Sequence, residues 1–147
     1  MKKNYFFSAL QEELDLLRKG ILTGGMPELR TLTVRCSAVH EALCRRLFRE
    51  FVVPLDRGDL FLISQGICRV FFGLSNLHGW GEENQETMME AVGLFTPLPL
   101  GESALSVAAR CQDLALSAAR KESCLCPFFD GMRVLSEAFL VAALHNA

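Results

Sequence analysis

Apolar residues recur at steps of three and four along most of this chain, and this spacing is the strongest constraint on its fold. Side chains spaced in this way lie on one face of an α-helix. The first stripe runs from Phe6 to Ile21 and ends at Thr23-Gly24-Gly25, a sequence that favours a turn. No segment shows the alternation of β-branched residues that is typical of strands. The sequence therefore predicts an all-α protein.

Five further helices are expected, and together with the first they form one antiparallel bundle of about six helices over residues 1–147. Their expected ranges are 27–51, 56–74, 82–95, 102–121 and 128–142. The helix at 56–74 is apolar over most of its circumference, with Ile67 and Phe71 on one side and Phe61, Leu62 and Phe72 on another. It is therefore expected at the centre of the bundle, as the most buried helix.

A proline and an aspartate mark the boundary between the second and third helices. Pro54 cannot continue a helix, because its ring clashes with the preceding turn. Asp56 then has the position of an N-cap residue, and Asp59 adds a second acid in the first turn. Leu55 and Leu60 stand where a hydrophobic staple is expected.

Composition excludes several function classes. The 147 residues are 50% apolar and carry a formal charge of −2, which disfavours a protein dominated by nucleic-acid phosphate contacts. The charged start Met1-Lys2-Lys3 runs into polar Asn4, so no secretory leader is expected, and six cysteines then indicate a reducing cytoplasm. Each long apolar stretch is interrupted before the length of a membrane span, so a soluble protein is predicted.

The sequence shows no carrier of catalysis or of metal binding. It has no glycine-rich phosphate loop and no Gly-x-Ser-x-Gly elbow, so we do not expect an enzyme. Cys124 and Cys126 are too close for the usual zinc spacing and lack a second pair. The other four cysteines lie on apolar stripes, where we interpret them as small core residues. No metal and no cofactor is therefore expected.

The second helix carries a row of arginines with Glu41 as the one acid between positions 30 and 49. The candidates for partner contact are Arg35, Arg45, Arg46 and Arg49. Such a row is often only solvated, and it can also bind an acidic protein, a lipid head group or nucleic acid.

The segment from Leu47 to Leu60 resembles the signature of the PhoU-like family, which is often encoded beside phosphate transporters. The matching residues are Phe51, Pro54, Asp56, Arg57 and Asp59. The resemblance covers residues 5–75, whereas residues 82–147 are divergent. It implies a PhoU-like helical bundle that acts as an accessory or regulatory protein of inorganic phosphate transport through protein–protein contact. The implied partner is a phosphate transporter or a signalling protein, with membrane association only through that partner, and a homo-oligomer is compatible with it.

The resemblance does not extend to the acidic metal motifs of the family. Those motifs fall on Thr33 to Ser37 and on Cys68 to Phe72, where no acid is present. A divergent member that keeps the scaffold and the partner role is therefore implied. The alternative is a helical adaptor or nucleic-acid-associated regulator that uses the basic face of the second helix. A metal-dependent enzyme is a third and remote hypothesis.

Overall fold

The computed structural model describes residues 4–25 and 27–147, and within them the chain forms six helices and no strand. The helices are α1 (Tyr5–Thr23), α2 (Glu28–Arg49), α3 (Arg57–Ser75), α4 (Gly81–Gly93), α5 (Ser103–Arg120) and α6 (Cys126–His145). The all-α prediction is confirmed, and each expected helix has a counterpart. The segment Met1-Lys2-Lys3, from which no secretory leader is expected, lies outside the described residues.

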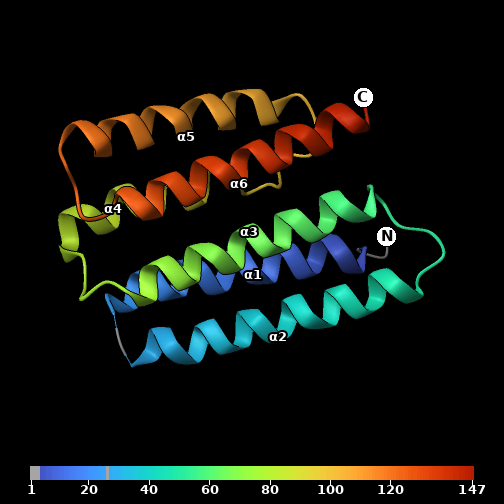
Figure 1. Ribbon diagram of the computed structural model, residues 1–147, viewed down its shortest axis with the longest axis horizontal. Helices are drawn as coiled ribbons and strands as arrows, with labels where there is room; N and C mark the ends of the chain where they lie inside the picture. Colours follow the sequence, from blue (N-terminus) through green and yellow to red (C-terminus); the bar gives the residue numbers. More distant parts are fainter. Residues whose placement is uncertain (1–3, 26) are drawn as a thin grey trace.

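The helices pack as an antiparallel bundle with α3 near its centre (Figure 1). Helix α3 packs against α1 and α2 on one side and against α6 on the other, and α5 covers the far side of α6. The shorter α4 packs against α1 and α6. None of these helices, in the part of the chain that the structure describes, combines the length and the hydropathy needed to cross a membrane.

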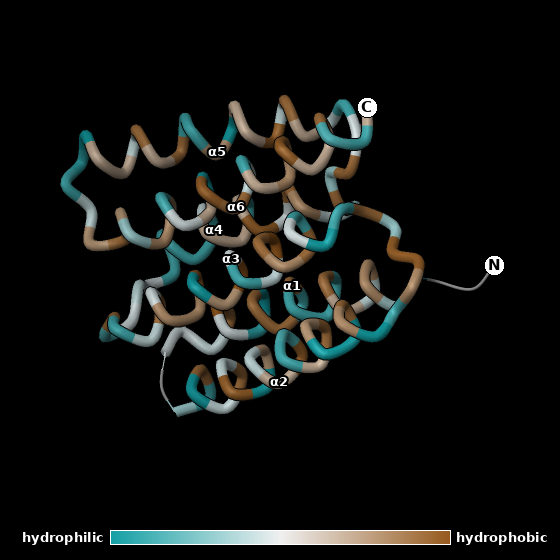
Figure 2. The backbone as a smooth tube through the Cα atoms, turned by 45° about the vertical axis from the view of Figure 1, so that its right-hand side comes forward, coloured by the Kyte–Doolittle hydropathy of each residue, from teal (hydrophilic) through white to brown (hydrophobic). Residues whose placement is uncertain are grey.

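The interior is built from the apolar faces that the sequence periodicity predicts. Along each helix, apolar and polar residues alternate with the turns of the backbone (Figure 2). Ile67 and Phe71 of α3 are fully buried, as predicted. The second apolar side of α3 is not covered, because the neighbouring helices leave one strip of it facing solvent. Phe61, Leu62 and Phe72 lie on that strip and are 37%, 54% and 56% exposed.

The ends of the first three helices show which local predictions hold. Gly24 ends α1 in the left-handed conformation, with φ of 74°, and donates its N–H to the carbonyl of Ile21. Asp56 caps α3, because its side chain accepts hydrogen bonds from the N–H groups of Gly58 and Asp59. The second helix is shorter than expected, since it ends at Arg49 and not at Phe51.

Candidate functional site

Three charged residues, Asp56, Arg57 and Asp59, have structural roles at the junction of α2 and α3. The Arg57 guanidinium donates to the carbonyls of Leu47, Glu50 and Phe51, so it satisfies the free acceptors at the C-terminus of α2. Asp56 caps the N-terminus of α3. Asp59 is buried, and its Oδ2 lies 2.7 Å from Nδ1 of His145 at the end of α6. Together these contacts fix the α2–α3 junction to the bundle.

The same junction exposes three large apolar side chains, which we call the apolar corner: Phe48, Phe51 and Val52. Their exposed fractions are 93%, 96% and 81%. The sequence placed Phe51 on the buried stripe of the second helix, and this is a correction. The helix ends two residues earlier, at Arg49, so the backbone becomes extended at Glu50 and Phe51 no longer follows the helical face.

The predicted arginine row is divided among different environments. Arg46 is half-buried, pairs with Glu50 and stacks 3.8 Å above the ring of Tyr5, so it is used within the fold. Arg35 lies in the N-terminal half of α2, beside a surface groove formed mainly by α1. Arg45 and Arg49 are exposed next to the apolar corner, and Arg45 also pairs with Glu41.

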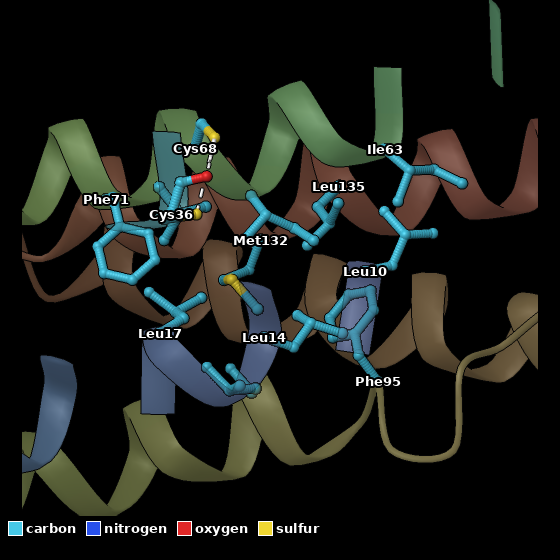
Figure 3. Close-up of a cluster of buried hydrophobic side chains, with 14 of the residues drawn as sticks. Leu10, Leu14, Leu17, Cys36, Ile63, Cys68, Phe71, Phe95, Met132 and Leu135 are labelled. Carbon is cyan, nitrogen blue, oxygen red and sulfur yellow. Dashed lines mark hydrogen bonds between the residues drawn. The ribbon is translucent and has the colours of Figure 1, made fainter. Parts of the chain in front are cut away.

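A second unusual feature lies inside the bundle, where α1, α2 and α3 meet. We call it the thiol–carboxyl cluster: Glu13, Cys36, Ser64 and Cys68. Glu13, Cys36 and Ser64 are 0% exposed and Cys68 is 6% exposed. Figure 3 shows Cys36 and Cys68 facing each other beside apolar side chains of the core. The two sulfur atoms are 3.7 Å apart.

The two carboxyl oxygens of Glu13 have different partners. Oε1 accepts a hydrogen bond of 2.6 Å from the hydroxyl of Ser64. Oε2 faces both thiols, at 3.8 Å from Sγ of Cys36 and 3.9 Å from Sγ of Cys68. In the described residues, no buried side-chain nitrogen or oxygen lacks a hydrogen-bond partner.

A short polar chain connects the cluster to the surface of α2. Nδ1 of His40 lies 2.7 Å from Oγ of Ser64, and Nε2 of His40 lies 3.7 Å from Sγ of Cys44. Cys36, His40 and Cys44 are four residues apart, so α2 presents them one turn apart on the same face. His40 and Cys44 are half-buried, whereas Cys36 is fully buried.

Burial favours the neutral forms of Glu13 and His40. Desolvation raises the pKa of Glu13 to about 9, so its carboxyl group is protonated in the folded protein at neutral pH. The hydrogen bond between the two sulfurs raises the pKa of Cys36 and lowers that of Cys68, so Cys68 is the first of the pair to ionise. Desolvation also lowers the pKa of His40, which favours its neutral form.

The thiol–carboxyl cluster was not predicted from the sequence, although the sequence contains one signal of it. Glu13 stands three residues after Leu10 and four before Leu17, so it lies on the apolar stripe of α1 rather than on its polar side. The interpretation of cysteines as core residues is confirmed for Cys36, Cys68 and Cys111, while Cys44 is half-buried. Cys124 is exposed and Cys126 half-buried.

No family model, curated protein or solved structure matches this chain. Its function is therefore inferred from the apolar corner, the thiol–carboxyl cluster and the local resemblance around residues 47–60.

Proposed function

We propose that this protein is a helical regulatory adaptor that works by protein–protein contact, and that the apolar corner with Arg45 and Arg49 is its contact surface. The observation that carries this proposal is the nearly complete exposure of Phe48, Phe51 and Val52 at one end of the bundle. Exposed apolar residues that occur singly need no explanation, whereas these three large side chains, all exposed within five consecutive residues, support an interaction site.

The corner has the composition of an interface centre. Aromatic and arginine side chains are enriched at the positions that dominate binding free energy. Full burial of one large apolar side chain stabilises a complex by about 1.5–3 kcal/mol before the costs of association are subtracted. The hydrogen bonds from Arg57 to the end of α2 hold the corner in place before a partner arrives, which reduces the entropy lost on binding.

The partner that fits this surface presents apolar side chains flanked by acidic residues. The PhoU-like resemblance of the junction makes the cytoplasmic loops of a phosphate transporter, or a signalling protein of phosphate uptake, the first partners to test. The alternative, a nucleic-acid-associated regulator, has less support because the chain carries a formal charge of −2 and Arg46 is used within the fold. Catalysis is not part of the proposal.

The test compares two double variants, each of which removes two phenylalanine side chains, one pair from the apolar corner and the other from α3. Phe48→Ser with Phe51→Ser changes the corner, while Phe61→Ser with Phe72→Ser changes the exposed strip of α3. Binding is measured by calorimetry against purified transporter loops, and self-association by sedimentation. We expect the corner variant to lower affinity at least about tenfold, which corresponds to about 1.4 kcal/mol, and the α3 variant to bind like the wild type.

Charge reversal tests the flanking arginines in the same assay. Arg45→Glu with Arg49→Glu should weaken binding to an acidic loop while helix content stays unchanged. Equal weakening by the corner and α3 variants, or binding that neither the corner variant nor the charge reversal affects, would remove the corner as the contact surface. If the wild type associates with itself and the corner variant does not, the occupant is a second copy of this chain.

A further inference from the structure

The thiol–carboxyl cluster is a different site from the apolar corner, and its residues point to a ligand of their own. We propose that Glu13, Cys36 and Cys68 bind one Zn²⁺ ion in the interior of the bundle. The sequence predicts no metal site, because the second and third helices lack suitably spaced acids and Cys124 and Cys126 have no second pair of ligands. Glu13 belongs to α1, so only the folded chain places it beside the two thiols.

The geometry of the three donor atoms fits a zinc ion. The two sulfurs and Oε2 of Glu13 form a nearly equilateral triangle with sides of 3.7, 3.8 and 3.9 Å. A point equidistant from the corners of that triangle is about 2.2 Å from each atom, close to the usual zinc bonds of about 2.3 Å to sulfur and 2.0–2.2 Å to a carboxylate oxygen. Movements of a few tenths of an ångström would complete the site.

The donor set also selects the class of ion. Thiolates favour soft and borderline ions such as Zn²⁺, whereas Mg²⁺ and Ca²⁺ require shells made of oxygen. The triangle supplies three protein ligands, and a small displacement of the ion from its plane leaves the fourth tetrahedral position for another donor such as water.

A Zn²⁺ ion would supply the positive charge that three deprotonated ligands need in a buried position. Three deprotonated ligands in a buried position are very costly without a cation, because burial penalises each negative charge. Binding of Zn²⁺ to the protonated cluster releases three protons, two from the thiols and one from Glu13, and the resulting complex carries one net negative charge. Affinity should therefore rise steeply with pH.

Ser64 and His40 form the outer layer of the proposed site. The Ser64 hydroxyl holds Oε1 of Glu13 and so turns Oε2 toward the sulfurs. His40 is half-buried and its Nδ1 lies within hydrogen-bond distance of Ser64 Oγ. The path Glu13–Ser64–His40 can therefore also transfer a released proton toward solvent. Cys44 on α2 and Tyr5 on α1 are the further titratable groups whose ionisation Glu13 influences. Such outer residues orient metal ligands and typically affect metal affinity by about 10-fold to 100-fold.

The test uses the full chain, reduced and stripped of metal with a chelator. Co²⁺ serves as the spectroscopic probe, because tetrahedral thiolate coordination gives intense visible bands and a sulfur-to-metal charge-transfer band. We expect one equivalent of Co²⁺ to bind with these bands and one equivalent of Zn²⁺ to displace it. Zn²⁺ should also raise the melting temperature, since an ion that binds only the folded state stabilises it.

Variants then locate the site. Glu13→Gln keeps the size and hydrogen bonding of the protonated side chain but removes the carboxylate ligand, so stoichiometric binding should be lost while the fold is kept. Cys36→Ala and Cys68→Ala should each abolish the charge-transfer band. Ser64→Ala should weaken Zn²⁺ binding about 10-fold to 100-fold.

Two controls distinguish this site from other thiols. Cys111→Ala removes a buried thiol of α5 outside the cluster, and Cys124→Ser with Cys126→Ser removes the pair before α6. Both should bind Zn²⁺ like the wild type. The proposal is overturned if the wild type binds no stoichiometric Zn²⁺, if bound Co²⁺ lacks the thiolate bands, or if the Cys124/Cys126 variant rather than Glu13→Gln loses binding. None of these results depends on the apolar corner.

Discussion

The apolar corner and the thiol–carboxyl cluster depart in opposite ways from the usual distribution of side chains in a folded protein. At the corner, Phe48 and Phe51 are almost fully exposed to water, although α3 and α6 bury Phe71 and Phe139 completely. In the cluster, the carboxyl group of Glu13 is removed from water, although most acids of the chain are solvated. Neither arrangement is explained by the stability of the isolated chain, and both therefore point to function.

The two regions also differ in how the chain supports them. Hydrogen bonds from side chains to backbone groups hold the corner, since Arg57 donates to the carbonyls at the end of α2 and Asp56 caps α3. The cluster is held by side-chain contacts among three consecutive helices, between residues that are 23 to 51 positions apart in the sequence. A substitution in the cluster should therefore change global stability, whereas one at the corner should change binding. Three predictions sharpen this difference, in order of decreasing effect.

The largest difference in the free energy of unfolding is expected between two phenylalanine-to-alanine substitutions. Phe71→Ala removes a fully buried ring of α3 and should lower the free energy of unfolding by about 3–5 kcal/mol. Phe51→Ala removes a ring that is 96% exposed and should change it by no more than about 0.5 kcal/mol. Urea unfolding of both variants measures the difference. Comparable losses would show that Phe51 packs against the bundle in solution.

Glu13→Gln should stabilise the metal-free protein at neutral and alkaline pH. Burial raises the pKa of Glu13 from 4.5 in the unfolded chain to about 9 in the folded protein, so between these values only the folded state keeps the proton. The free energy of unfolding of the wild type should then fall with rising pH, by at most about 1.4 kcal/mol per pH unit. The amide variant should lack this slope. Unfolding curves at pH 5 to 8 with a chelator measure it, and parallel pH profiles for the two proteins would contradict the neutral state of Glu13.

The fold was largely predictable from the sequence, because its determinants are local. The apolar spacing gives the helices, and Gly24 and Asp56 give two of their ends through contacts within a few residues. The exposure of Phe51 was not predictable, because it depends on α2 ending at Arg49, where Arg57 donates hydrogen bonds to free carbonyls that are six to ten residues away. The strip of α3 with Phe72 was likewise missed, since periodicity does not show how many neighbours a helix has.

The cluster was predictable only in fragments. The position of Glu13 on an apolar stripe was visible in the sequence, and so were cysteines on the stripes of two other helices. Their proximity in space could not be predicted, because it depends on how α1, α2 and α3 are rotated and shifted relative to one another. Side-chain packing sets these quantities, and Cys36 lies 32 residues from Cys68 and 23 from Glu13. The role of the Arg57 and Asp59 signature positions as anchors of the junction also required the folded chain.

The smallest effect is expected from the cap that supports the corner. Asp56→Ala removes the acceptor for the N–H groups of Gly58 and Asp59, which should lower the free energy of unfolding by about 0.5–2 kcal/mol. Asp56→Asn retains a side-chain oxygen and should behave almost like the wild type. Because the first turn of α3 also carries Arg57, a frayed cap loosens the contacts that hold the end of α2, so Asp56→Ala should weaken binding at the apolar corner as well. Thermal melting and the loop-binding assay, carried out on the same three proteins, test both parts. A melting curve that Asp56→Ala leaves unchanged, together with lost binding, would mean that Asp56 contacts the partner directly and that the corner does not depend on this cap.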